Sequence, residues 1–302
     1  MNVLVTGGTG FIGSALVKRL AAQGYDVTVL SRNPNNIEKL CGRGVKSLAG
    51  LKHLNQDDTF QVVINLAGAP IFDALWTDAR KKVIRDSRIA LTEELIESIR
   101  RMTVKPELLI SGSAIGYYGD QGDTMLTENS PSQPDFSQQL CTDWEAAAKK
   151  AEALGVSVCL IRTGLVIAAG GGLLQRMLLP FRLYLGGRLG SGKQWMSWIH
   201  RQDWIAIAET MITDPSMQGA YNATAPNPVA NSEFTDTLAR CLKRPAFLPM
   251  PTFVLKTLLG EMSQLVLGSQ RVIPERLLAQ GFKFQYTDLA SALKQAIAQS
   301  HE

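Results

Sequence analysis

Asn2-Val3-Leu4-Val5-Thr6-Gly7-Gly8-Thr9-Gly10-Phe11-Ile12-Gly13 is the stretch that decides the fold. Val3–Val5 form an apolar run that suits a parallel strand buried on both faces. Beyond the glycines, apolar residues recur every four positions and predict a helix: Ile12, Leu16 and Leu20. The spaced glycines allow a tight turn and the close approach of a pyrophosphate, which the free N–H groups of the helix N-terminus would bind. The stretch therefore predicts a dinucleotide site.

Composition excludes several classes of protein. The chain has 302 residues, 45% apolar content and a net charge of +4. Its basic residues are scattered, so we expect no nucleic-acid partner. No apolar run approaches the length of a membrane span, and a strand begins at once, so we expect no membrane partner and no signal peptide. The cysteines are far apart, which favours free thiols and a cytoplasmic location: Cys41, Cys141, Cys159 and Cys241.

The rest of the chain alternates between predicted strands and helices. Further strands are expected at 26–30, 45–48, 61–68, 107–111, 156–161 and 220–223. Helical patterns cover 76–100, interrupted by charge at 85–88, and 136–153. This alternation predicts an α/β fold, a Rossmann-type doubly wound parallel sheet with a smaller, mostly helical C-terminal substrate domain. The nucleotide domain is assigned to 1–165, with 195–225 returning to it, and the substrate side to 166–194 and 226–302.

The end of the second strand bears on cofactor choice. An acidic residue there would hold the ribose hydroxyls of NAD, whereas an arginine accommodates the 2′-phosphate of NADP. The chain has Ser31-Arg32 and no carboxylate, and a guanidinium can offer charge-assisted hydrogen bonds to a phosphate. The pattern favours NADP(H); a solvated arginine at a helix start is the alternative.

Hydroxyl groups gather where the strand at 107–111 ends. Ser111, Ser113, Tyr117 and Tyr118 follow one another there, an arrangement able to bind or protonate a carbonyl oxygen. A turn of small residues whose tyrosine rings cover the sheet edge explains the same pattern. His200 is a further candidate acid, although a structural histidine is the simpler interpretation; His53 and His301 lie outside every motif.

These motifs together resemble the extended short-chain dehydrogenase/reductase superfamily, which contains the nucleotide-sugar epimerases and dehydratases. The resemblance rests on 6–13, 65–68, 111–114 and 198–203. More narrowly, the chain resembles the atypical "epimerase family" branch, sometimes called cell-division-inhibitor-like. The segments that carry this resemblance are 113–119, 144–147, 179–182, 222–228 and 271–274. The resemblance implies NADP(H) binding, an unidentified small-molecule substrate and a possible homodimer. The cofactor-binding residues that we assign are Gly7, Thr9, Gly10, Phe11, Ile12, Gly13, Ser31, Arg32, Leu66, Ala67, Gly68, Arg88, Ser111 and Arg162.

One departure from the superfamily affects catalysis. Its reductases and epimerases use a Tyr-x-x-x-Lys pair on the helix after the fifth strand, with the tyrosine as acid/base. Here Leu140 and Trp144 have that spacing, and neither can transfer a proton. Ser113 matches the superfamily's catalytic serine, and Tyr117 or Tyr118 could replace the missing phenol beside a positive charge such as Arg88 or Arg162. The first hypothesis is therefore an NADP(H)-binding oxidoreductase or epimerase-like enzyme that acts on an unknown carbonyl or hydroxyl substrate with a rearranged acid/base. The alternative is a catalytically silent NADPH-binding sensor or scaffold. No metal site is expected.

Overall fold

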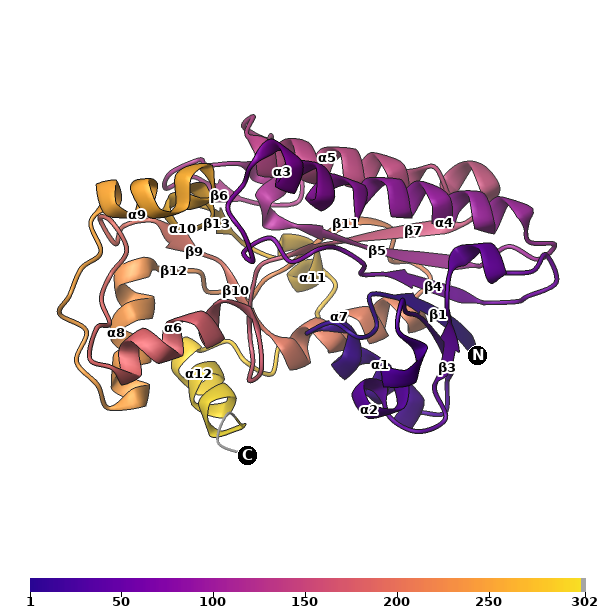
Figure 1. Cartoon of the computed structure of the whole chain (residues 1–302), viewed down its shortest axis with the longest axis horizontal. Coiled ribbons are helices and arrows are strands. Elements are labelled where there is room, and N and C mark those ends of the chain that lie inside the picture. Colours follow the sequence, from indigo (N-terminus) through magenta and orange to yellow (C-terminus); the bar gives the residue numbers. More distant parts are fainter. Residues whose placement is uncertain (300–302) are drawn as a thin grey trace.

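Seven parallel strands form the central sheet of the computed structural model, which describes residues 1–299 (Figure 1). Their order is β11-β7-β5-β4-β1-β2-β3. The chain progresses outward from β1 in both directions, so the order reverses between β1 and β4, and the carboxyl ends of these strands leave a crevice for a ligand. The strands are β1 (Asn2–Thr6), β2 (Asp26–Leu30), β3 (Lys46–Leu48), β4 (Val62–Asn65), β5 (Leu108–Ala114), β7 (Ser157–Thr163) and β11 (Gly219–Ala223).

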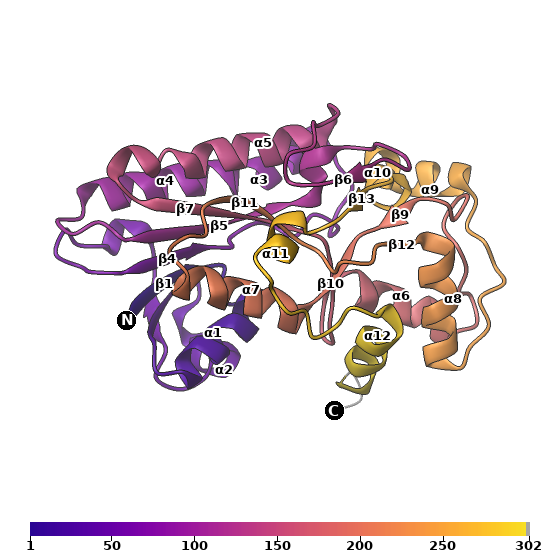
Figure 2. The ribbon, with the colours of Figure 1, turned by 180° about the vertical axis from the view of Figure 1, so that it is seen from behind.

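Helices cover both faces of this sheet, as Figure 2 also shows. One face carries α1 (Gly13–Ala22), α2 (Ile37–Cys41) and α7 (Arg201–Thr213). The other carries α3 (Asp78–Asp86), α4 (Ile89–Arg101) and α5 (Phe136–Lys149). Alternate residues of the strands point to opposite faces: Val3 and Val5 pack with α1, whereas Leu4 packs with α4. The predicted doubly wound parallel sheet is confirmed.

The helix expected over 76–100 is two helices, because the chain breaks at Ser87 and Arg88. Ser87 Oγ donates to Ile84 O at 2.9 Å and accepts from Ala69 N–H at 2.9 Å. Arg88 Nη1 donates to Ile84 O at 3.2 Å, so both side chains bond to the last turn of α3. Such bonds compete with the helical hydrogen-bond ladder and end it.

The smaller part of the molecule is mostly helical, as predicted. Its core is a separate apolar cluster that includes Phe181, Trp198 and Phe234. Short strand pairs connect it: β8 with β10, β9 with β12, and β6 with β13. The elements are β6 (Met125–Leu126), β8 (Leu165–Ile167), α6 (Gly172–Arg182), β9 (Trp195–Met196), β10 (Trp198–His200), β12 (Val229–Ala230), α8 (Asn231–Leu242), α9 (Thr252–Leu259), α10 (Gln264–Leu267), β13 (Arg271–Val272), α11 (Glu275–Ala279) and α12 (Leu289–Ala298).

Five short 3-10 helices complete the described elements: η1 (Pro34–Asn36), η2 (Leu51–His53), η3 (Ile115–Tyr118), η4 (Glu152–Leu154) and η5 (Gly260–Ser263). Of the segment assigned to the nucleotide domain at 195–225, α7 packs on the large sheet and β11 is an edge strand of it, whereas β9 pairs with β12 in the smaller part. The exact domain limits stay a prediction. His301 and the end of the predicted 226–302 segment lie outside the described residues. Across 1–299, every helix is too short or too polar to cross a bilayer.

Candidate functional site

The glycine loop between β1 and α1 is shaped by close backbone contacts. Gly7 has a φ of +68°, and a Cβ on it would lie 2.5 Å from the carbonyl carbon and oxygen of Leu66. A Cβ on Gly13 would lie 2.2 Å from Gly7 O. Within the described residues, the backbone N–H groups of Phe11, Ile12 and Gly13 have no hydrogen-bond partner. Unpaired amides at a helix N-terminus fit the pyrophosphate of a dinucleotide.

Phe11 also joins this loop to the substrate side. Its ring lies against Gly171, where a Cβ would be 2.3 Å from the ring atom Cδ2. The Arg201 guanidinium lies 5.0 Å from the centroid of the same ring. Arg201 Nη1 donates to Phe11 O at 3.3 Å and to Ala169 O at 3.4 Å. The start of α6, the start of α7 and the glycine loop therefore meet at one side chain.

Ser31 and Arg32 lie at the end of β2, as the sequence places them. Ser31 is buried, and its Oγ accepts from Asn33 N–H at 3.1 Å. Arg32 is exposed and has no hydrogen bond or ion pair with any described residue. A free guanidinium without a neighbouring carboxylate fits the 2′-phosphate of NADP(H).

A buried polar network holds the carboxyl end of β4. Thr6 Oγ1 donates to Asn65 Oδ1 at 2.7 Å, and Ala67 N–H donates to Thr6 Oγ1 at 3.2 Å. Asn65 Nδ2 donates to Thr92 Oγ1 at 2.8 Å and, more weakly, to Ser111 Oγ at 3.4 Å. The network fixes the Leu66–Gly68 segment beside the glycine loop. Ser111, predicted to contact the cofactor, is fully buried inside this network, so its side chain supports the site from within.

Arg88 lies flat against Gly68. A Cβ on Gly68 would be 2.8 Å from Arg88 Cζ, and the guanidinium lies 5.4 Å from the centroid of the Trp144 ring. Nη1 donates to Ala69 O at 3.1 Å, whereas Nε and Nη2 have no partner among residues 1–299. Burial lowers the pKa of Arg88 from its ordinary value. Trp144 occupies the position of the lysine in the superfamily's Tyr-x-x-x-Lys pair. Arg88 therefore places a cation beside the position where that lysine is missing.

Ser113 lies at the end of β5 and bonds to a buried ion pair. Its Oγ donates to Glu145 Oε1 at 2.7 Å. Arg162, from β7, donates through Nε to Glu145 Oε1 at 2.8 Å and through Nη2 to Oε2 at 2.9 Å. The side chains of Arg162 and Glu145 are only 5% and 4% exposed. Despite burial, hydrogen bonding to Glu145 and its charge raise the pKa of Arg162, so the guanidinium stays charged.

The two tyrosines differ in what they contact. Tyr118 is fully buried; its hydroxyl donates to Asn222 Oδ1 at 2.7 Å and accepts from Arg162 Nη1 at 3.0 Å. Burial raises the pKa of Tyr118 to about 12. Tyr117 is half-buried, its ring centroid lies 3.4 Å from Arg162 Cζ, and its hydroxyl has no partner within the described residues.

Two sequence assignments therefore need correction. Arg162 was assigned to the cofactor, but Nε, Nη1 and Nη2 all donate to protein acceptors. Tyr118 was a catalytic candidate, but its proton is donated to Asn222, its oxygen accepts from Arg162, and it is sealed from solvent. Both residues instead support Ser113 and Tyr117 from the core.

Glu145 is a residue of the site that the sequence pattern did not single out. The α5 side chains that face Ser113 are Cys141 and Glu145, four residues apart, rather than Leu140 and Trp144. Burial raises the pKa of the Cys141 thiol to about 12, so that thiol is inert. The signal was an arginine within the apolar strand Ser157–Thr163, since a buried guanidinium requires a carboxylate partner.

His200 has a structural role. It is 1% exposed, its Nδ1 accepts from Gln202 N–H at the start of α7, and its Nε2 lies 2.8 Å from Gln295 Oε1. Burial lowers its pKa. Among residues 1–299, no group of three or more metal-ligating side chains is placed to hold an ion, and all four cysteines are free thiols.

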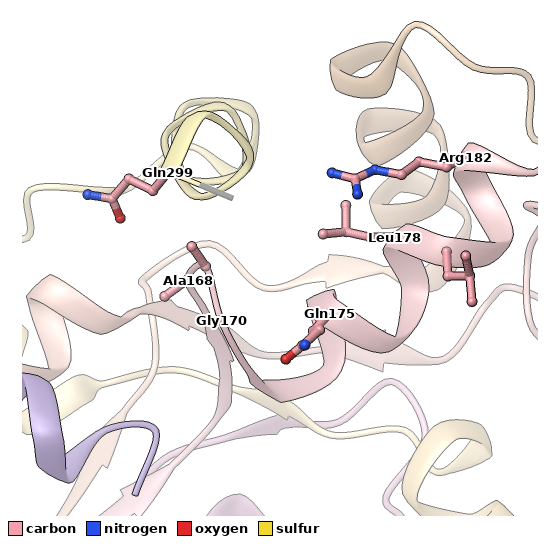
Figure 3. A pocket seen from close by; sticks show the side chains of 8 residues that line it. Ala168, Gly170, Gln175, Leu178, Arg182 and Gln299 are labelled. Carbon is pink, nitrogen blue, oxygen red and sulfur yellow. The ribbon is translucent and has the colours of Figure 1, made fainter. Parts of the chain in front are cut away.

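A cavity of about 410 Å³ lies between α6 and α12 (Figure 3). Figure 3 shows Gln175, Leu178 and Arg182 of α6 along one side and Gln299 across from them. None of the predicted site residues lines it. Its walls are Ala168, Ala169, Gly170, Gln175, Leu178, Leu179, Arg182 and Gln299.

Comparison with known proteins agrees with this geometry. The model of the NAD dependent epimerase/dehydratase family matches residues 3–223, and a domain of unknown function, DUF1731, matches 250–296. "Epimerase family protein SDR39U1 homolog, chloroplastic" from Arabidopsis thaliana is 40% identical, covering 97% of this chain and 86% of that protein. "Epimerase family protein YfhF" from Bacillus subtilis (strain 168) is 39% identical, covering 99% and 98%.

A solved structure extends the comparison. Human epimerase family protein SDR39U1 (isoform 2), crystallised with NADPH, superposes with a TM-score of 0.89 at 34% identity and covers 99% of both chains. The family expected from the motifs is thus confirmed over the whole chain. This chain belongs to the NAD-dependent epimerase/dehydratase family, in the group of SDR39U1-like epimerase family proteins.

Proposed function

We propose that this chain is an NADP(H)-dependent oxidoreductase or epimerase-like enzyme that acts on a carbonyl or hydroxyl group of a small molecule, with a nucleotide sugar as the candidate that the superfamily suggests. The observation that carries the proposal is the buried Glu145–Arg162 pair, which bonds Ser113 and lies under the Tyr117 ring. A site that only bound the nucleotide would not need hydroxyl groups fixed in this way. The human relative crystallised with NADPH supports the choice of cofactor.

We propose a role for each side chain. Bound NADP(H) would supply or accept the hydride. Ser113 donates its proton to Glu145, so its lone pairs are left to accept a hydrogen bond from a substrate hydroxyl. The Tyr117 hydroxyl is free to exchange a proton with the substrate oxygen. The Arg162 guanidinium places a positive charge beside negative charge that develops on Tyr117 during that transfer.

Arg88 completes the proposed cofactor site. Its free Nε–H and Nη2–H groups lie along Gly68, at the carboxyl end of β4. They would donate to ribose or phosphate oxygens, a task that the superfamily's lysine performs from α5.

The alternative is an NADPH-binding sensor or scaffold without turnover. It is favoured by the two buried apolar residues, Leu140 and Trp144, at the spacing of the missing acid/base pair. In this case Glu145 and Arg162 are structural, and the nucleotide site alone has a function.

Two conservative variants separate these functions. Purified Ser113→Ala and Tyr117→Phe would be assayed for NADPH binding, by nicotinamide fluorescence, and for turnover of a carbonyl and nucleotide-sugar panel. Tyr184→Phe is the matched control, since Arg244 lies 4.9 Å from the centroid of that exposed ring. We expect both site variants to bind NADPH normally and to lose at least a hundredfold in kcat. Two results would favour the sensor: turnover that is unchanged in both site variants, or no turnover of any substrate on the panel by wild type or variants.

Location and assembly stay proposals. Four free thiols support a cytoplasmic location, since they suit a reducing compartment. A homodimer through the long helices beside the sheet is proposed by analogy with the superfamily.

A further inference from the structure

Exposed apolar side chains gather in two segments of the smaller part, 176–193 and 240–258, which we call the apolar tip. Among residues 1–299, they hold nine of the sixteen large apolar side chains that are exposed. Phe253 is 72% exposed and Phe247 67%. Exposed apolar side chains gathered in this way indicate an interaction surface. The nine are Leu179, Leu183, Tyr184, Leu185, Phe247, Leu248, Met250, Phe253 and Leu258.

The two segments lie side by side. Leu248 N–H donates to Gly186 O at 3.2 Å, Gly190 N–H to Met250 O at 2.8 Å, and Met250 N–H to Arg188 O at 2.9 Å. In Figure 1, the connection from α6 to β9, the connection from α8 to α9, α8 and α9 together form the end of the molecule farthest from the N-terminus. The apolar tip is therefore one surface, remote from the central sheet.

The charge of the apolar tip has one sign. Its two segments contain eight arginines and lysines and no aspartate or glutamate. Because the whole chain carries +4, all other residues together carry −4. Arg176 pairs with Asp73, whereas the other seven cations form no ion pair with a described residue. They are Arg182, Arg188, Lys193, Arg240, Lys243, Arg244 and Lys256.

A shallow hollow of about 300 Å³ indents this surface. Arg188, Phe247 and Pro249 line it together with Asp236 of α8, a carboxylate that comes from outside the two segments. Asp236 and Glu233, both exposed on α8, are fewer than the seven unpaired cations of the two segments, so this end of the molecule keeps a net positive charge.

We propose that the apolar tip docks on the surface of an anionic lipid bilayer. Exposed aromatic and aliphatic side chains that insert into the headgroup boundary, together with unpaired cations, are what such docking requires. A second copy of this chain is a poorer occupant, because two surfaces with this excess of positive charge repel each other. The sequence-based expectation of no membrane partner considered only spanning segments, and surface docking needs none.

Vesicle flotation tests the proposal with the full chain. We expect the protein to float with vesicles of phosphatidylglycerol and phosphatidylcholine, much less with phosphatidylcholine alone, and less at high salt. Phe247→Ser/Phe253→Ser should lower partitioning roughly a hundredfold, about tenfold for each ring. The matched control is Leu75→Ser/Val104→Ser, at positions 52% and 56% exposed elsewhere.

A charge pair tests the electrostatic part. Arg244→Gln/Lys256→Gln should lower partitioning on anionic vesicles roughly twentyfold, about fivefold for each charge. Lys39→Gln/Lys52→Gln, also exposed, should change it little. No flotation on anionic vesicles, or equal flotation with and without the two phenylalanines, would overturn the proposal. Size-exclusion chromatography on the same proteins then shows whether the phenylalanine pair abolishes self-association, which would assign the tip to a second copy instead.

Discussion

Removing one partner of the Arg162–Glu145 pair should destabilise the protein strongly. In Arg162→Met, Glu145 loses two charge-assisted hydrogen bonds, at 2.8 and 2.9 Å, and keeps only the bond from Ser113. Because the carboxylate is 4% exposed, water cannot replace them. Leaving one buried charge unpaired costs about 3–5 kcal/mol. For a domain of this size, that lowers the melting temperature by about 10 °C.

Urea unfolding of a double-mutant cycle measures this. Arg162→Met and Glu145→Leu should each lower the free energy of unfolding by about 3–5 kcal/mol. The double variant buries no charge, so it should recover at least ~2 kcal/mol relative to the sum of the single variants. Lys150→Met is the control, since its pair with Glu93 is 57% and 49% exposed and should contribute under about 1 kcal/mol.

Two results would refute this reasoning. Additive single variants would mean that the two charges do not depend on each other. A loss below about 1 kcal/mol in Arg162→Met would mean that solvent reaches Glu145 in the folded protein.

Three further predictions concern the cofactor site and pH. Arg32→Ala should weaken NADPH binding roughly ten- to a hundredfold in a fluorescence titration and leave NADH binding unchanged; an equal loss for both nucleotides would contradict the 2′-phosphate assignment. Gly68→Ala places a Cβ 2.8 Å from Arg88 Cζ, so the arginine must move, and NADPH affinity measured by calorimetry should fall at least tenfold. Gly50→Ala, where the nearest atoms lie 3.7 Å away, is its control. Burial raises the pKa of Tyr118 to about 12, whereas an exposed tyrosine has about 10. The unfolded chain therefore loses this proton first, and stability falls as the pH rises from about 10 to about 12. Urea melts of Tyr118→Phe should show a flatter alkaline decline than wild type.

Local features of the fold were predictable from the sequence. The glycine loop and the strands around Val3–Val5 and 61–68 are specified by residues that are neighbours in the sequence. Their signals are the glycine turn, the apolar runs and the apolar stripe of the helix. The break between α3 and α4 was only partly visible, as charge at 85–88. The break depends on the hydrogen bond from Ala69 N–H to Ser87 Oγ, which joins the loop after β4 to the end of α3.

The centre of the candidate site depends on pairings between distant segments. Arg162, Glu145 and Ser113 come from β7, α5 and β5, and sequence spacing does not show that they meet. Tyr117 and Tyr118 are adjacent and chemically identical, so the sequence cannot rank them. The turn of η3 directs one hydroxyl to Asn222 and leaves the other without a partner.

The position of the Phe11 ring limits how family members can be recombined. The ring fills the space that a side chain at residue 171 would need. The Arg201 guanidinium lies 5.0 Å from the centroid of the same ring. A hybrid that joins residues 1–163 of this chain to a relative's remaining sequence will be sound only if that relative also has glycine at 171. In the reverse hybrid, a relative supplies residues 1–163. If that relative has a small side chain at position 11, a ring-sized void is left under Arg201. Residues 11 and 171 must therefore be exchanged together.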